Sequence, residues 1–346
     1  MSFGSRVLGR SATLPAVVLV PLFVFAVWPW LPLVGRGPAV RTVTFYGFSI
    51  LAEAMNDGVL PAFQEEWRRR TGERIEFITS FAGSGTVTNQ LIMGVPAQLA
   101  LLSLELDAMR LADAGVISRD SWRRLPENGV VNRTPIIVLV RADNPKGVRD
   151  FTDLTRPGIG VVHPDPLTSG GANWAILAEY GAGARAAQDS TEAGYRLLHG
   201  IWGNVVAGAA SARAARTQFD NGFGDALITY EQEAILDRKR GRLSAELVYP
   251  RSTILSEHTL VVIDSNIAPQ DRALIEALVT FLWSDRAQRI FVDHGFRSIR
   301  PGLESDDVFG HIEDPFTVAD LGGWAAAKRE IVDAIWQQRV LLEPRQ

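Results

Sequence analysis

Two short stretches rich in glycine and serine contain the residue types that bind anions. The first is Phe-Ala-Gly-Ser-Gly-Thr and includes Ser84; the second, about 85 residues further on, is Thr-Ser-Gly-Gly-Ala and includes Ser169. Each stretch follows a short apolar run and precedes a helix-like run. The start of a helix presents unpaired backbone N–H groups and a partial positive charge, and both favour an anion. The two stretches therefore predict two halves of an anion site built from hydroxyl and N–H donors.

Motifs for other chemistry are absent from the chain. Neither stretch is a GxxxxGK[ST], GxGxxG or GxSxG sequence, and HExxH does not occur. The five histidines lack metal-ligand spacing and there is no cysteine. We therefore expect no cofactor, no metal and no enzymatic activity. The rival hypothesis is an exported hydrolase that uses Ser84 or Ser169, and it requires a His or Lys within hydrogen-bond reach of that serine.

The residues around the second stretch also favour an anion site made of hydrogen-bond donors. His163 precedes it and is interpreted as a packing residue at a strand end, and Asp165, between two prolines, as a turn former. Neither stretch carries a carboxylate among its glycines and serines. A site made only of donors favours fully ionised sulfate over phosphate, which keeps a proton near neutral pH and needs an acceptor.

The composition fits an α/β protein outside the nucleic-acid-binding classes. The 346 residues are 47% hydrophobic and 21% charged, with a net charge of −4 and no basic block. Apolar strand-like runs alternate with helix-like runs, which favours parallel sheets covered by helices on both faces. The predicted strands are 40–45, 74–78, 98–103, 133–141, 158–162, 225–229 and 260–263, and the predicted helices are 51–71, 87–93, 107–114, 175–202, 212–221, 231–240, 270–283, 285–294 and 321–342.

The N-terminus has the pattern of an export segment. Arg6 and Arg10 precede an apolar run from Leu14 to Val34, and no acidic residue occurs before Glu53. This pattern predicts that residues 1–39 are a signal peptide or an uncleaved membrane anchor. The rest of the chain would then lie outside the cytoplasmic membrane.

The chain resembles the sulfate/thiosulfate-binding proteins of bacterial ABC importers, a type II periplasmic-binding-protein family. The resemblance extends from about residue 42 to the C-terminal tail. It is carried by Gly83-Ser84-Gly85, Trp122–Pro126, Val138–Arg141 with Asn144-Pro145-Lys146, Thr168–Ala172 with Trp174, Gly224–Ile228 and Gly322–Ala325.

The resemblance implies a two-lobed α/β fold, with mostly parallel sheets flanked by helices, that closes on a dehydrated anion. Residues 40–134 and 255–346, including the C-terminal helices, would form the first lobe, and residues 135–254 the second. The implied partners are sulfate or thiosulfate and the transmembrane subunits of an ABC permease. The protein would be a periplasmic monomer.

The resemblance also implies the anion donors. Hydroxyl donors would come from Ser84 and Ser169, and backbone N–H donors from Ser169, Gly170, Gly171, a turn at Ser211–Ala212 (assigned to Ala212) and an early loop at Gly47. The family's indole donor falls on Tyr230. A phenol can accept a hydrogen bond as well as donate one. Molybdate, tungstate, thiosulfate and other tetrahedral oxyanions therefore stay open as alternatives to sulfate.

Overall fold

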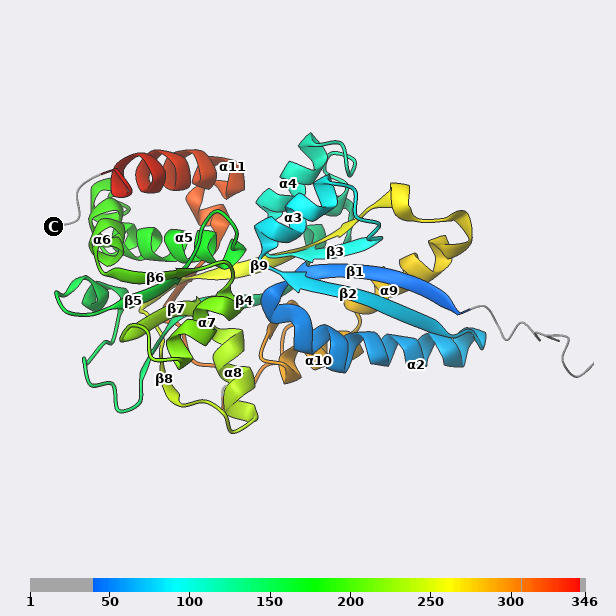
Figure 1. The fold of residues 1–346 in the computed structure, drawn as a ribbon, viewed down its shortest axis with the longest axis horizontal. Helices are drawn as coiled ribbons and strands as arrows, with labels where there is room; N and C mark the ends of the chain where they lie inside the picture. The colour runs from blue at the N-terminus through cyan, green and yellow to red at the C-terminus, as the bar shows by residue number, and fades with distance from the viewer. Residues whose placement is uncertain (1–39, 306, 343–346) are drawn as a thin grey trace, which may run out of the picture.

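The computed structural model describes residues 40–305 and 307–342. They form two α/β lobes side by side along the longest axis of the molecule (Figure 1). Residues 1–39, predicted to be a signal peptide or anchor, lie outside the described residues. Among those described, no helix combines the length and apolar character needed to cross a membrane.

The first lobe is built on three parallel strands near the N-terminus. Strand β1 (Arg41–Phe48) lies between β2 (Ile75–Ala82) and β3 (Leu99–Leu102). The inward side chains of β1 are apolar and buried, which anchors the sheet in the core. Its helices are α2 (Leu60–Thr71), α3 (Ser84–Ile92), α4 (Glu105–Asp113), α9 (Arg272–Leu282) and α10 (Asp285–Asp293).

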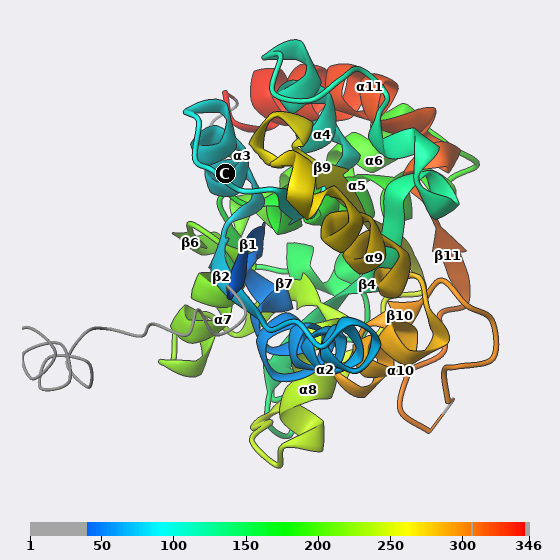
Figure 2. The same ribbon diagram turned by 90° about the vertical axis from the view of Figure 1, so that its right-hand side faces the viewer.

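The second lobe repeats this arrangement. Strand β5 (Val161–Pro164) pairs in parallel with β6 (Val205–Ala209) and β7 (Ala226–Tyr230), and β8 (Ala245–Val248) lies beside β4 (Val130–Arg141). Its helices are α5 (Gly170–Arg185), α6 (Thr191–Gly203), α7 (Ala212–Asp220) and α8 (Glu231–Lys239). In the end-on view the helices lie above and below the central strands (Figure 2).

Two long strands connect the lobes. β4 (Val130–Arg141) pairs antiparallel with β9 (Ser252–Val262) up to Pro135, and with β7 from Ile136 onward. The strand order is β2-β1-β3-β9-β4-β7-β5-β6. The two-lobed α/β fold is confirmed, but the sheet is mixed rather than mostly parallel. The reason is that the chain returns between lobes through long strands, which pair antiparallel, and not through crossover helices.

The C-terminal tail packs on the second lobe. It consists of α11 (Gly323–Ala327) and a wider π-type helix, η9 (Lys328–Val340). Trp324 stacks edge-on against Trp174 of α5, and Trp336 against Trp202 of α6, with ring centroids 4.6 and 5.1 Å apart. The sequence-based division placed this tail with the first lobe, whereas Figure 1 shows it over α5 and α6.

Helix α5 is the central element of the second lobe. Every residue from Gly170 to Ala184 is buried. Its glycines permit this, since a Cβ on Gly181 would lie 2.3 Å from the Phe316 ring and a Cβ on Gly183 would lie 2.8 Å from Leu197. Because α5 is enclosed by packing, its N-terminus, which holds the second glycine-serine stretch, is fixed in position.

The predicted elements around the two stretches are present with shifted ends. α3 begins at Ser84 and α5 at Gly170, so both stretches open directly into helices. The strand expected at 158–162 is found at 161–164, and β9 extends far upstream of the expected 260–263. The sequence did not indicate β6, β8, β10 (Arg297–Ser298) or β11 (Asp314–Phe316), which are short or half-exposed strands.

Candidate functional site

The two glycine-serine stretches meet at the boundary between the lobes. The Gly85 N–H donates a hydrogen bond to the Thr168 carbonyl oxygen at 3.1 Å. A Cβ on Gly83 would lie 2.4 Å from that oxygen and 2.6 Å from the carbonyl oxygen of Ala210. The starts of α3, α5 and α7 are therefore in contact, and glycine at position 83 makes their approach possible.

Several backbone N–H groups in the first turns of these three helices have no acceptor among the described residues. Those of Ser84, Gly170, Gly171 and Ala212 are among them. All four residues are buried. Unpaired N–H groups that converge at helix starts favour an anion, and here they come from both lobes. The structure thus brings together the predicted stretches and the predicted third turn.

The Ser169 N–H is an exception to the implied donor set. It donates to the Asp165 carbonyl oxygen at 2.8 Å, so it is not available to a ligand in this structure. The Ser169 side chain makes no cap bond to α5, which leaves its hydroxyl free to serve as a donor. Ser211 caps α7 through its hydroxyl, which accepts from Ala214 N–H at 3.1 Å. This bond fixes the start of α7 and places Ala212 at its first position.

A buried carboxylate lies behind the first stretch. The Ser84 hydroxyl donates to Asp107 Oδ2 at 2.6 Å and accepts from the Ser103 N–H at 3.0 Å. Asp107 is 2% exposed, and burial raises the pKa of its carboxyl although Ser84 and Arg110 act in the opposite direction. The Ser84 hydroxyl donates to an anion only after turning away from Asp107. Asp107 was not predicted, because α4 brings it in from 23 residues downstream.

Tyr230 lies at the same boundary. Its hydroxyl is 2.8 Å from the Ser103 hydroxyl, and a Cβ on Gly171 would lie 2.9 Å from its ring. Both hydroxyl-bearing residues are 1% exposed, and burial raises the pKa of the Tyr230 phenol well above its ordinary value. The phenol therefore stays protonated. Ser103 was predicted only as the end of a strand and is a further polar group of the site.

Gly47 lies in a strand rather than in the expected loop. It belongs to β1, opposite Phe81 of β2 and Leu101 of β3. A Cβ at this position would lie 2.8 Å from the Phe81 ring, which accounts for the glycine. The strand continues to Phe48, and a 3₁₀ turn follows at Ser49–Leu51.

Comparison with known proteins gives the family. A family model described as "Bacterial extracellular solute-binding protein" matches residues 43–297. The chain belongs to this family. This solute-binding protein is 33% identical over 311 residues to a sulfate-binding protein of Synechococcus elongatus, which covers 88% of each chain.

Two further relatives are similar over most of their length. A thiosulfate-binding protein of Pseudomonas aeruginosa is 31% identical over 78% of this chain and 82% of that one. Among solved structures, the sulfate-binding protein SubI of Mycobacterium tuberculosis is 31% identical, with a TM-score of 0.76 over 84% of this chain and 99% of that one. These matches confirm the two-lobed periplasmic-binding-protein fold.

An ion pair connects the lobes of this solute-binding protein beside the anion donors. Arg213, which follows Ala212, binds Glu53 of the first lobe through two bonds of 2.5 and 3.0 Å and Glu233 at 2.8 Å. Burial acts to raise the pKa of Glu53, but Arg213 outweighs it and the pKa lies below its ordinary value. Because Arg213 is already paired with two carboxylates, an anion at these helix starts would be bound by N–H and hydroxyl dipoles.

The hydrolase hypothesis fails its geometric requirement in the part of the chain that the structure describes. The Ser84 hydroxyl contacts Asp107 and the Ser103 backbone, and no His or Lys bonds Ser84 or Ser169. His163 bonds the Pro164 carbonyl oxygen at 2.7 Å and Glu179 at 3.1 Å, as expected of a packing residue. No cluster of metal-ligating side chains occurs among these residues either.

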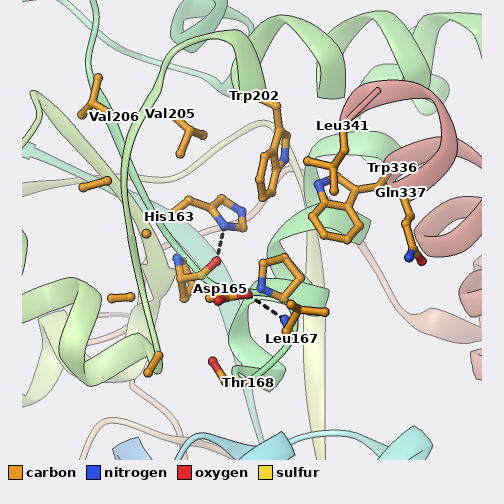
Figure 3. Close-up of a pocket in the computed structure, with 16 residues that line it drawn as sticks. His163, Asp165, Leu167, Thr168, Trp202, Val205, Val206, Trp336, Gln337 and Leu341 are labelled. Atoms are coloured by element: carbon orange, nitrogen blue, oxygen red, sulfur yellow. Dashed lines mark hydrogen bonds between the residues drawn. The ribbon is translucent and has the colours of Figure 1, made fainter. Parts of the chain in front are cut away.

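A cavity lies next to the second stretch and is partly lined by it. Its volume is about 660 Å³, and it is lined by His163, Trp202, Val206, Trp336 and neighbouring residues (Figure 3). Asp165 lies at its edge and accepts from the Leu167 N–H at 2.8 Å, which confirms its role as a turn former. The lining is largely apolar and includes none of the unpaired N–H donors. The predicted anion site therefore adjoins this cavity at Thr168 and Ala210, but its N–H donors lie outside the lining.

Proposed function

We propose that this chain is an exported receptor that captures sulfate or thiosulfate between its lobes and delivers the anion to a membrane ABC permease. The supporting observation is the meeting of three helix starts across the two lobes, with buried and unpaired N–H groups that include those of Ser84, Gly170, Gly171 and Ala212. The names of the relatives, sulfate-binding and thiosulfate-binding proteins, agree with a tetrahedral oxyanion.

The donors act in two groups. Ser84, through its N–H, binds from the first lobe; Ser169, through its hydroxyl, and the N–H groups of Gly170, Gly171 and Ala212 bind from the second. Tyr230 completes the set in this proposal. Because the donors belong to different lobes, the anion stabilises the closed arrangement over an open one. No covalent step is involved, and no cofactor is required.

The remaining parts of the chain fit delivery at a membrane. Residues 1–39 serve as a signal peptide or as an anchor, which places the receptor on the outer face of the cytoplasmic membrane. The receptor works there as a monomer. The permease recognises the closed lobes. A receptor of this kind binds its anion reversibly and releases it unchanged.

Calorimetric titration of the full-length protein with sulfate, thiosulfate, molybdate and phosphate tests the proposal. We expect sulfate or thiosulfate to bind with one site per chain. Failure of both to bind at millimolar concentration would refute the function, and a strong preference for molybdate would assign the protein to the molybdate/tungstate alternative.

A further inference from the structure

Two hydroxyl groups lie side by side at the boundary between the lobes. Ser103 Oγ, at the end of β3, and Tyr230 Oη, at the end of β7, are 2.8 Å apart. Both residues are buried, and neither hydroxyl has another partner among the described residues. They come from different lobes, so the pair spans the boundary at which the anion would bind.

The hydroxyl pair borders the unpaired N–H groups of α5. A Cβ on Gly170 would lie 2.6 Å from Ser103 Oγ, and a Cβ on Gly171 would lie 3.2 Å from Tyr230 Oη. An anion that accepts hydrogen bonds from these two glycines therefore has the hydroxyl pair within reach.

A hydroxyl pair can accept a hydrogen bond as well as donate one, which an N–H group cannot do. With a fully ionised anion, one hydroxyl hydrogen is used inside the pair and one reaches the anion. With an anion that carries a proton, the anion donates to Ser103, Ser103 donates to Tyr230, and Tyr230 donates back to a second oxygen of the anion. The protonated anion thus makes two hydrogen bonds to the pair, whereas the ionised anion makes one.

We propose that Ser103 and Tyr230 extend the ligand range of this site to tetrahedral oxyanions that carry a proton, of the hydrogen phosphate and hydrogen arsenate class. This inference rests on the proposed function, since it assumes an oxyanion at the start of α5. It assigns Ser103 and Tyr230 the role of a specificity-determining pair. The buried phenol stays neutral and can complete the ring of hydrogen bonds.

A comparison of selenate with arsenate separates the effect of a proton on the anion from the effect of the anion's size. The two anions have similar dimensions, but selenate is fully ionised near neutral pH whereas arsenate keeps a proton. The measurement is the ratio of their dissociation constants for the full-length protein by calorimetry. We expect both to bind, with arsenate weaker than selenate by less than about a hundredfold.

The variant Ser103→Ala/Tyr230→Phe removes both hydroxyls together, so neither is left without a partner and the fold is little affected. We expect it to weaken arsenate binding about tenfold more than selenate binding, because arsenate loses one more hydrogen bond. The single variants Ser103→Ala and Tyr230→Phe complete a double-mutant cycle. Tyr180→Phe, which removes a hydroxyl further along α5, is the matched control and should leave the ratio unchanged.

The outcomes separate this inference from the proposed function. If selenate binds and arsenate binds more than about a hundredfold more weakly or not at all, the inference fails and the oxyanion receptor stands. If the double variant weakens both anions equally, the pair is not the discriminating element. If neither selenate nor sulfate binds, the proposed function itself is wrong. The ratio of the arsenate and selenate dissociation constants of the wild type shows whether the site accepts a protonated anion, even if the double variant does not fold.

Discussion

The variant Ala212→Pro removes one proposed anion donor, a backbone N–H, and leaves every polar side chain in place. Ala212 is the first residue of α7, a position at which proline is favoured because its missing N–H has no partner within the helix. The preceding residue, Ser211, is extended with φ −156° and ψ 164°, which is compatible with a following proline. The substitution therefore deletes one N–H and leaves the helix intact.

The size of the effect follows from the kind of bond that is lost. A hydrogen bond to a charged group contributes about 1.5–3 kcal/mol, which corresponds to a weakening of sulfate affinity of about 10- to 150-fold. The proline ring also occupies the place of the N–H, which shifts the expected result toward the upper end of this range. Stability without anion should change by less than about 1 kcal/mol.

The assay is sulfate titration by calorimetry, with thermal unfolding measured in parallel. Thr191→Pro is the matched control, since Thr191 is the exposed first residue of α6 and Ser190 before it is also extended. We expect this control to bind sulfate as the wild type does. If Ala212→Pro also keeps the wild-type affinity within about twofold, the α7 start is not part of the anion site.

Three further substitutions test other parts of the account. Asp107→Asn removes the negative charge that binds the Ser84 hydroxyl, so sulfate affinity should rise by about 1 kcal/mol in calorimetry, and a fall would contradict this. The pKa of Glu53 is lowered in the folded protein, so its contribution to stability is present above its unfolded pKa and is lost as the pH falls through its folded pKa. The unfolding free energy of the wild type should therefore drop between about pH 7 and about pH 4, and this drop should be smaller in Glu53→Gln. Gly181→Ala places a Cβ 2.3 Å from the Phe316 ring and should cost about 1–3 kcal/mol in urea unfolding with sulfate affinity unchanged; unaltered stability would mean that α5 is not tightly enclosed.

The donors that lie on the backbone could be predicted from local sequence. Glycine and serine between a strand and a helix determine where N–H groups stay unpaired, and this prediction places Ser84, Gly170 and Gly171 at helix starts in the structure. The same local rules could not show that the Ser169 N–H turns back to Asp165, since that bond depends on the fold of the turn.

The side chains that modify the site come from elements distant in sequence. Asp107 reaches Ser84 because α4 follows β3 along the same edge of the sheet, and Ser103 meets Tyr230 because β3 and β7, of different lobes, end at the same boundary. Neither contact has a sequence signature. The antiparallel pairing of β9 also escaped prediction, because a long strand that crosses between lobes looks the same in sequence as one that stays within a sheet.

The most direct test of the central claim is to locate the anion. Selenium scatters X-rays anomalously, so a crystal of the protein with selenate would show the position of the anion as a peak in the anomalous difference map. We expect selenate oxygens about 2.7–3.2 Å from the N–H nitrogens of Gly170, Gly171 and Ala212. An anion found instead in the cavity beside Trp202 and Trp336, or only at arginines on the surface, would contradict the account.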